Sequence, residues 1–437
     1  MIIIQQPKII QLNGKSRLVA DIDIDGECKT LWFETDEEYE KYLCYERSDA
    51  FLVGALPFAM RNNHDIKCIA PVTEELLYNL EQHLIPTLCQ TDSSVYRTSI
   101  ITEYTSELLG NHGGVGTAMS GGVDSFYTTI THLKDLNTHT HPVLTHFFIS
   151  NVGNFHNKSR KKYGVQRSKK ETYELAEKIA EDIGLPLIET DSNFKDIFLG
   201  GKQIVYAIAF AVMAMRKLWK VYLLPASYDY GKFSLNQHTQ KGSEYYALLL
   251  LNCFSTQELR FYCDGGPLDR IERTAAIVDF PTVKKYLYVC WVKGKNCGHC
   301  GKCRRTIMAL DILEKLDDYK ELFPIEYYKR HLKDYFAWLE RRIPEDDKFA
   351  LDIYKHMRKN GKYPEIVKKL EVLIEKMSPL YELQQERIKL KTTESKLNEL
   401  RIKLKLTIKR MDSQKVKINS LYNSRSWRIT KPLRILK

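Results

Sequence analysis

The stretch V-G-T-A-M-S-G-G-V-D-S-F, residues 115–126, decides the fold that this chain is predicted to adopt. Residues 115–119 are typical of a short apolar strand, and residues 126–136 of an amphipathic helix, with a glycine-rich turn between them. A turn of this kind directs backbone N–H groups outward at the positive end of a helix, where they hold phosphate oxygens. The stretch therefore predicts a phosphate-binding turn, and a serine-glycine turn without a ligand is the alternative.

The side chains of the turn supply the candidate contacts. Glycines at its centre let the backbone approach a ligand closely, and serine hydroxyls add donors. Asp124 either orients the loop or holds Mg²⁺, because an unpaired carboxylate would repel phosphate. The run lacks the G-K-[ST] ending of a Walker-type P-loop, so transfer of a γ-phosphate is not implied. The candidate nucleotide-binding residues are consecutive: Ser120, Gly121, Gly122, Val123, Asp124 and Ser125.

A second motif, C-x6-C-x2-C-x2-C, consists of Cys290, Cys297, Cys300 and Cys303. Closely spaced cysteines can present four thiolates to one tetrahedral zinc ion. A [4Fe–4S] cluster and a set of reactive thiols are the alternatives. The N-terminus M-I-I-I-Q-Q-P-K lacks the pattern of a secretory signal, so we expect a cytoplasmic setting that disfavours disulfides. We therefore expect zinc, with His299 exposed to solvent because four cysteines already fill the tetrahedron.

Between the two motifs, strand and helix patterns alternate. Strands are expected at 143–150, 186–190 and 221–225, and helices at 168–183 and 204–218. This alternation predicts an α/β fold, a parallel sheet with helices on both faces.

Ligands of such sheets bind at the carboxyl ends of the strands. Ser120, Ser150 and residues 227–229 would converge there.

The two motifs, S-G-G-V-D-S and C-W-V-K-G-K-N-C-G-H-C-G-K-C-R-R, resemble in this order the ATP pyrophosphatase (PP-loop) superfamily. The closest resemblance is to 7-cyano-7-deazaguanine synthase, the queuosine biosynthesis family, over about residues 115–316. It implies an adenine nucleotide alpha hydrolase-like fold with a zinc knuckle, and a ligase that uses ATP and Mg²⁺. ATP would activate a small carboxylic acid, such as 7-carboxy-7-deazaguanine, as an acyl adenylate. Ammonia or another amine would then give the amide, and a second adenylation the nitrile.

The resemblance also implies site residues. The segment P-L-D-R-I-E-R-T-A-A-I resembles the family's lysine-bearing segment, with Arg273 in the place of the lysine. The implied catalytic residues are Asp124, Ser125 and Arg273. Arg270 and either Arg304 or Arg305 are further candidate cations.

Two departures from the family concern the substrate. Alanines at 275–276 replace the family's glutamate, and Y-D-Y-G-K-F-S-L-N-Q-H-T-Q replaces its base-holding stretch. Polar residues of this altered loop could hold a substrate or only satisfy the loop: Asp229, Asn236, Gln237 and His238.

The length of 437 residues predicts more than one domain. Residues 1–110 are expected to form an α+β domain, with strands within 9–25 and 29–33 and helices at 36–43 and 73–84. Its E-R-S-D-A-F cluster is interpreted as a salt-bridged helix start, with Arg47 or Asp49 as active-site or dimer contacts in the alternative. Residues 111–316 would form the ATP pyrophosphatase-like domain. No apolar run reaches the ~20 residues that span a bilayer.

A helical extension is expected at 317–378, followed by a break at Pro379 and a basic coiled coil with tail at 379–437. Apolar residues recur there every seven positions, which predicts a coiled coil and a homo-oligomer. They are Leu383, Leu390, Leu397, Leu404, Met411 and Ile418.

Positive charge is concentrated at this end. Residues 383–437 hold 16 Lys and Arg against 4 Asp and Glu, a net +12 in a chain of net +11. A basic helix can meet an anionic membrane, an acidic protein or nucleic acid, of which nucleic acid is not favoured here.

The final N-S-R-S-W-R-I-T-K-P-L-R resembles the tail of bacterial glycosyltransferases and other surface-polysaccharide enzymes. That resemblance implies a glycan-assembly partner or a place at the inner face of the membrane. Alternative functions are therefore a PP-loop enzyme that transfers sulfur or an amine in RNA or glycan modification, and a catalytically silent scaffold.

Overall fold

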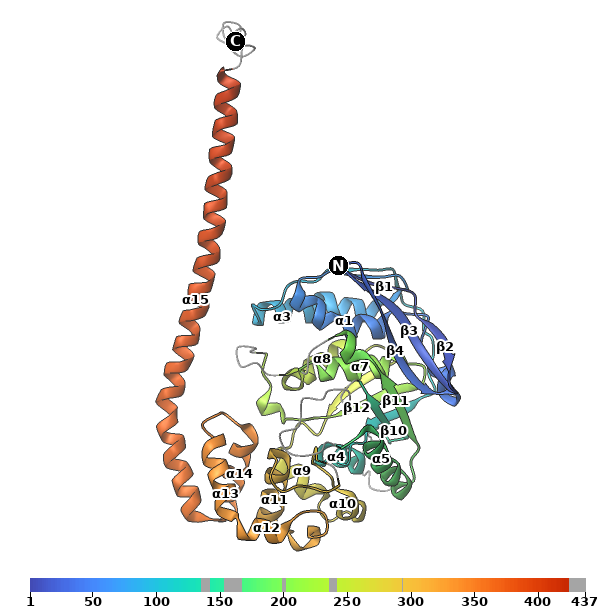
Figure 1. Cartoon of the computed structure of the whole chain (residues 1–437), viewed down its shortest axis with the longest axis vertical. Helices are drawn as coiled ribbons and strands as arrows, with labels where there is room; N and C mark the ends of the chain where they lie inside the picture. Colours follow the sequence, from blue (N-terminus) through green and yellow to red (C-terminus); the bar gives the residue numbers. More distant parts are fainter. Residues whose placement is uncertain (135–141, 153–166, 199–201, 236–241, 293, 424–437) are drawn as a thin grey trace. The chain divides into compact units, whose positions relative to one another are not determined.

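The computed structural model describes residues 1–437 except 135–141, 153–166, 199–201, 236–241, 293 and 424–437 (Figure 1). The chain divides into two compact units, Met1–Val367 and Lys368–Lys437. The first unit is an α/β structure built on an 11-stranded mixed sheet in the order β13-β12-β9-β10-β11-β4-β3-β1-β5-β7, with β2 paired to β3.

One half of this sheet is parallel, as the alternating pattern predicts. Adjacent strands within this half pair in parallel. The two neighbouring strands β9 and β12 are apolar apart from Thr117, Lys220 and the Tyr222 hydroxyl, which suits strands covered on both faces. The strands are β9 (Gly114–Ala118), β10 (His146–Asn151), β11 (Leu187–Ser192), β12 (Trp219–Pro225) and β13 (Arg260–Asp264).

Helices cover both faces of the parallel half (Figure 1). On one face lie α4 (Val123–Thr131) and α5 (Lys169–Ile183), and on the other α7 (Ile204–Ala214) and α8 (Ala247–Phe254). α7 is apolar all round because it packs between the sheet and the N-terminal helix α1 (Asp49–Asn62). Short connecting helices are α6 (Phe194–Ile197), η4 (Tyr230–Lys232) and η6 (Ser243–Tyr246).

Residues 1–110, expected as a separate domain, extend the same sheet. β4 pairs antiparallel with β11, with Phe33 opposite Ser192. Buried Phe33 and Ile188 belong to one continuous hydrophobic core. The domain boundary predicted at residue 110 therefore does not separate two cores. The strands are β1 (Ile2–Ile4), β2 (Lys8–Leu12), β3 (Lys15–Ile24), β4 (Glu27–Asp36), β5 (Ile66–Cys68) and β7 (Ile100–Ile101). β6 (Val72–Thr73) and β8 (Tyr104–Thr105) form a separate pair.

Two N-terminal helices differ from the sequence pattern. The helix expected at 36–43 is a 3₁₀ turn, η1 (Glu37–Tyr42). The helix expected at 73–84 begins as α2 (Glu74–Tyr78), passes through a π-helical turn, η2 (Asn79–Leu84), and continues as α3 (Ile85–Thr91). Pro86 explains the π turn, because a proline lacks the N–H that an uninterrupted α-helix requires.

The carboxyl-terminal part of the first unit is helical, as expected from residue 317 onward. α11 and α14 pack against each other, and both contact α9. The elements are α9 (Arg270–Ile277), α10 (Pro281–Tyr286), α11 (Gly301–Ile312), η7 (Asp317–Tyr319), α12 (Ile325–Arg330), α13 (Leu332–Arg342) and α14 (Lys348–Lys359).

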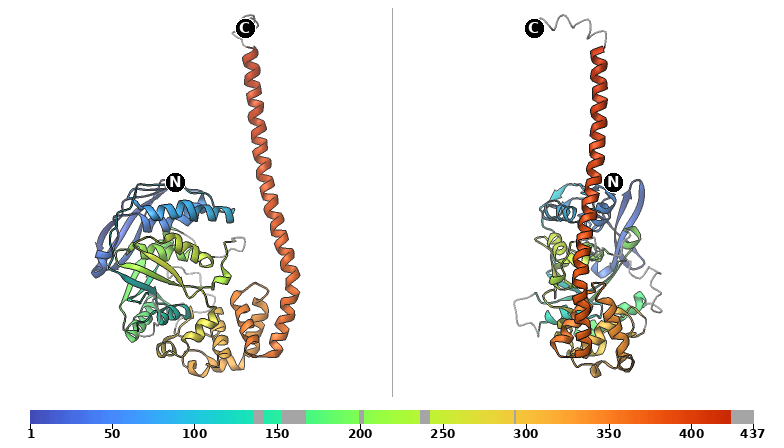
Figure 2. Two further views of the ribbon diagram at one scale, coloured as in Figure 1. Left: turned by 180° about the vertical axis from the view of Figure 1, so that it is seen from behind. Right: turned by 90° about the vertical axis from the view of Figure 1, so that its left-hand side faces the viewer.

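The last helix, α15 (Pro364–Asn423), is continuous through Pro379, where the sequence predicts a break (Figure 2). A proline inside a helix removes one hydrogen bond, and the helix-favouring Leu, Glu and Lys residues on both sides offset that loss. Within the described residues, no helix is both long enough and apolar enough to cross a membrane.

A buried ion network ties α1 to the residues after α7. Arg216 bonds the Asp49 carboxylate and donates to Glu258 at 3.1 Å, and Arg47 donates to Thr73 Oγ1 at 2.9 Å. The side chains of Arg216 and Asp49 are 4% and 3% exposed. Asp49 begins α1, as expected, but the ion pairs of Arg47 and Asp49 join distant residues, Glu258 and Arg216, and do not form a salt bridge within the turn.

Replacing Arg216 by Met should lower the free energy of unfolding by about 3–5 kcal/mol, because buried Asp49 would lose its ion-pair partner and Glu258 would lose one of two. Urea denaturation measures the change. Lys217→Met is the matched control, since Lys217 pairs with Glu46 at a more exposed position, and its cost should be about 1 kcal/mol or less. Equal effects of the two substitutions would contradict the importance of the network.

Candidate functional site

The glycine-rich turn leaves the sheet at the carboxyl end of β9, between β12 and β10, where the order of the parallel strands reverses. This is the position at which open α/β sheets bind ligands. Gly121 has φ +75°, and a Cβ there would lie 2.9 Å from Leu175. The hydroxyls of Ser120 and Ser125 lie 3.1 Å apart, and Ser125 Oγ donates to the Gly122 carbonyl at 3.0 Å. The serines thus shape the turn that the sequence predicts.

A cavity of about 530 Å³ opens beside this turn. Of the six residues expected to bind nucleotide, Ser120, Gly122 and Asp124 line it. Val123 and Ser125 are buried, and they support the turn from the α4 side. The turn therefore presents one hydroxyl, one carboxylate and the backbone at the start of α4 to the cavity.

Both oxygens of Asp124 are engaged by arginines. Arg270 Nη1 donates to one oxygen at 2.6 Å, and Arg273 Nη1 to the other at 2.7 Å. Burial alone would raise the pKa of Asp124, but Arg270, Arg273 and Arg305 together hold that pKa below its usual value. Asp124 is consequently a fixed anion that orients the two arginines of α9.

Arg273, an expected catalytic residue, lies behind the cavity wall. Its side chain is 1% exposed, and it also donates to the Ala226 carbonyl after β12. This arrangement joins the turn, α9 and the end of β12, so Arg273 positions Asp124. Its neighbour Arg270, and not Arg273, lines the cavity.

Of the residues that the structure describes, four cations line the cavity: Arg167, Arg270, Lys302 and Arg305. Burial, followed by the neighbouring guanidinium groups, lowers the pKa of Lys302 to about 7. The same causes, burial first, lower the pKa of Arg305 to about 9. Among the described residues, the carboxylates on the wall are Asp124 and Glu244. The wall therefore holds an excess of positive charge, which an anionic ligand would offset.

The structure separates the two arginines that follow the last cysteine. Arg305 faces the cavity, whereas Arg304 donates to the His299 carbonyl at 2.9 Å and to the Asp334 carbonyl at 2.9 Å. Sequence reasoning missed Lys302 and Arg167. The spacing carries a signal for Lys302, since residues three apart on α11, such as Lys302 and Arg305, share a helix face.

An aromatic group closes another part of the cavity wall. Tyr228 stacks on Phe349 of α14, with ring centroids 5.2 Å apart, and on Tyr245 at 4.0 Å. The Arg305 guanidinium lies 3.8 Å from the centre of the Phe349 ring. The helical extension thus contributes directly to the site.

The remaining polar candidates differ in position. Ser150 lines the cavity, and its buried hydroxyl has no hydrogen-bond partner among the described residues. Asp229, for which the sequence leaves substrate binding and loop support open, pairs with Lys232, which also bonds Asp352 of α14. Asn236, Gln237 and His238 lie outside the described residues.

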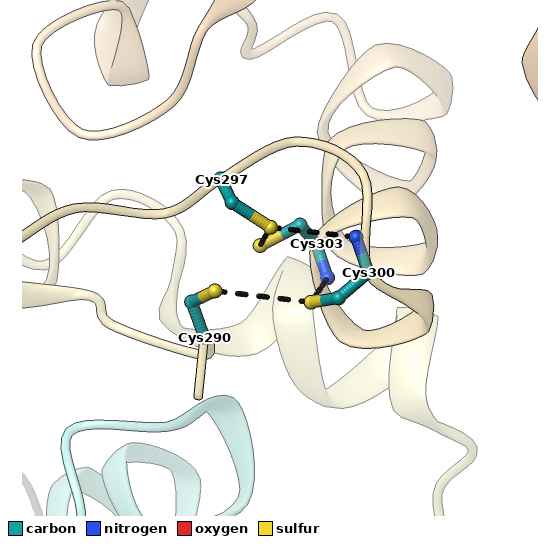
Figure 3. A group of neighbouring side chains, drawn as sticks. All are labelled: Cys290, Cys297, Cys300 and Cys303. Atoms are coloured by element: carbon teal, nitrogen blue, oxygen red, sulfur yellow. Dashed lines mark hydrogen bonds between the residues drawn. The ribbon is translucent and has the colours of Figure 1, made fainter. Parts of the chain in front are cut away.

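The four motif cysteines converge (Figure 3), and Cys290 among them lines the cavity. The sulfurs of Cys290 and Cys300 lie 3.8 Å apart, and those of Cys297 and Cys303 3.9 Å apart. All four sulfurs lie within 4.8 Å of one another. Four thiolates about 2.3 Å from one tetrahedral ion would be about 3.8 Å apart, so the group could hold a metal ion such as zinc. All ten cysteines of the chain are free thiols.

His299, inside the knuckle, is exposed, as predicted, and its ring packs edge-on against Tyr327 with centroids 4.8 Å apart. A second set of potential ligands, Asp269, Glu272 and His356, has another role. Asp269 caps α9 by accepting from the backbone of Ile271 and Glu272, and His356 bonds its other oxygen at 2.7 Å. This set therefore anchors α14 to the start of α9.

Comparison of the chain with known protein families, with curated proteins and with solved structures found no match in any of the three.

Cys297→Ser should lose the bound metal and lower the melting temperature, because a four-thiolate site couples metal binding to folding. Elemental analysis of the purified protein and a thermal melt measure the two effects. Cys28→Ser is the control, since Cys28 is exposed and lies outside the cluster. Full metal content in Cys297→Ser would show that the cluster is not the binding site.

Proposed function

We propose that this chain is an ATP-dependent C–N ligase of the PP-loop type, similar to 7-cyano-7-deazaguanine synthase. It would convert a small carboxylic acid into an acyl adenylate and pass the acyl group to ammonia or another amine. The observation that carries the proposal is the excess of cations around a glycine-rich turn at the start of α4. Arg270, Lys302 and Arg305 share one cavity with that turn.

A carboxylate must be activated before an amine can attack it. Its oxygen is nucleophilic enough to attack the α-phosphorus of ATP, but its carbon is a poor electrophile. Attack breaks the bond between the α-phosphorus and the bridging oxygen, and pyrophosphate leaves with the electron pair. The amine then attacks the acyl carbon, AMP leaves with the shared oxygen, and the ammonium proton passes to solvent. Cations beside the phosphates stabilise the charge that develops in both steps.

The residues of this chain have separable roles in such a reaction. The backbone at Gly122 and the Ser120 hydroxyl would hold phosphate oxygens at the positive end of α4. Arg270, Lys302 and Arg305 would neutralise pyrophosphate as it leaves. Asp124 and Arg273 would fix Arg270, since both oxygens of Asp124 already accept bonds from guanidinium groups. That engagement favours an orienting role for Asp124 over Mg²⁺ binding, and Mg²⁺ would accompany the triphosphate.

Zinc in the cysteine cluster would hold the start of α11 in place. Cys300 and Cys303 lie on either side of Lys302, and Cys303 is fully buried at the first turn of α11. An ion that fixes these two thiolates also fixes the start of α11, which carries Lys302 and Arg305. We therefore assign the metal a structural role that sets the cationic wall.

The acid substrate would face the aromatic side of the cavity. Tyr228 and Phe349 present stacked rings next to Arg305, an arrangement that suits a planar, carboxylate-bearing heterocycle. The unpaired hydroxyl of Ser150 offers a donor on the same cavity wall. A deazapurine acid fits this description better than a flexible aliphatic acid.

A turnover assay tests the proposal. Purified protein is incubated with ATP, Mg²⁺, ammonia and 7-carboxy-7-deazaguanine, and mass spectrometry follows AMP and the mass of the base. The proposal predicts AMP together with an amide or nitrile product. Formation of ADP and phosphate in place of AMP would contradict it.

Arg305→Met should weaken ATP binding about 10-fold to 100-fold, because a buried charge-assisted contact contributes about 1.5–3 kcal/mol. Isothermal titration calorimetry with ATP and Mg²⁺ measures the loss. Arg304→Met is the matched control, because Arg304 carries the same charge on the same turn but bonds backbone carbonyls away from the cavity. Similar affinity losses in the two variants would argue against phosphate contact by Arg305.

A further inference from the structure

The second unit exposes an apolar stripe along α15, in positions that repeat every seven residues. Its six members are between 48 and 65% exposed in the single chain. They are Leu383, Leu390, Leu397, Leu404, Met411 and Ile418, and we call them the heptad stripe. Leu400 and Leu421, each three residues after a stripe member, widen it at two levels and are 62% and 61% exposed.

The period of the stripe selects the kind of surface that can cover it. A seven-residue repeat drifts by about 20° per heptad around a straight α-helix, which amounts to about 100° over the five repeats from Leu383 to Ile418. A flat bilayer meets one fixed face of a helix, so it cannot cover a stripe that winds around it. A second helix that supercoils with α15 can cover the whole length. The stripe therefore fits a helical protein partner.

The residues that flank the stripe carry the charge. The residue directly before each of the last five stripe members, the g position of the heptad, is basic in every case: Lys389, Lys396, Lys403, Arg410 and Lys417. The residues four after the first five members, the e position, are Arg387, Glu394, Arg401, Ile408 and Lys415. Eight of these ten flanking residues are cations and one is an acid.

This pattern works against pairing with a second copy. In a parallel pair, each g residue faces the e residue five positions later in the other copy. Lys396 would then face Arg401, and Arg410 would face Lys415, whereas Lys389 facing Glu394 is the single opposite-charge pair. In an antiparallel pair, g positions face g positions, and all five are basic. Like charges at these positions repel in both arrangements.

We propose that the heptad stripe docks an acidic amphipathic helix of another protein, with apolar residues along its own seam and Glu or Asp at the flanking positions. Contact along the seam would bury the six stripe side chains. The basic residues at the e and g positions would pair with acidic residues of the partner and thereby select it. This assignment replaces the homo-oligomer that periodicity alone predicts. It is independent of the chemistry proposed for the first unit.

Two synthetic peptides test the proposal with the full-length chain. Both have the sequence of residues 383–423, and in one of them all eight flanking Lys and Arg residues are replaced by Glu. Fluorescence anisotropy at low salt should show that the acidic peptide binds at least 10-fold more tightly than the unchanged peptide. Sedimentation without peptide should show a monomer. A stable dimer of the full chain at low salt would overturn the proposal in favour of a second copy.

A pair of matched variants separates docking on the stripe from general attraction to positive charge. Leu397→Ala with Leu404→Ala should weaken binding of the acidic peptide at least 10-fold, because it shortens two seam residues. Ile402→Ala with Leu406→Ala removes apolar side chains of similar exposure on the same helix but outside the stripe, and should leave binding within 2-fold. Equal binding by both variants would overturn the proposal, since charge alone would then explain the attraction. Alanine favours helix, so circular dichroism should show unchanged helix content in both.

Discussion

The double ion pair of Asp124 with Arg270 and Arg273 is the interaction on which the cavity depends. Asp124 lies at the start of α4, and both arginines come from α9, which lies some 145 residues later in the chain. Arg273 also bonds the backbone at Ala226, so the pair joins the turn after β9 to the end of β12. A buried guanidinium needs an anion nearby, and Asp124 supplies one without placing a free carboxylate against the cavity.

The cysteine cluster and α14 hold the rest of the cavity wall in place. The cysteine cluster holds the first turn of α11, and that turn places Lys302 and Arg305 on the cavity wall. α14 contributes Phe349, and Asp352 of the same helix holds Lys232. The segment after the cysteine knuckle is therefore part of the site, because its removal would expose both the aromatic wall and the buried Arg305.

Local patterns predicted the parallel half of the sheet, the turn and the cysteine cluster, because each depends on residues close together in sequence. The turn leads from a strand into a helix, as expected, but α4 begins at Val123, three residues earlier than the pattern predicts. Pairing of β4 with β11 was not predictable, since it joins Phe33 to Ser192 across a long separation and depends on a shared core. Helix continuity through Pro379 was missed because a proline marks a boundary only when nothing on either side sustains the helix.

The sequence also does not reveal the direction in which a side chain points. Three arginines that the sequence does not distinguish have different positions. Arg273 lies behind the cavity wall, Arg304 points away from the cavity, and Arg305 faces it. Lys302 shares a helix face with Arg305, as the spacing indicates, but its position on the cavity wall comes from the structure alone. Asp229 is likewise polar in a suitable loop but is engaged by Lys232.

The most direct test of the central claim is the fate of the carboxylate oxygen. Turnover of 7-carboxy-7-deazaguanine labelled with ¹⁸O in both carboxylate oxygens would be analysed by mass spectrometry of the phosphorus products. An acyl adenylate predicts one ¹⁸O atom in AMP and none in pyrophosphate. Label in inorganic phosphate, accompanied by ADP, would contradict the account, because it would place the attack at the γ-phosphorus.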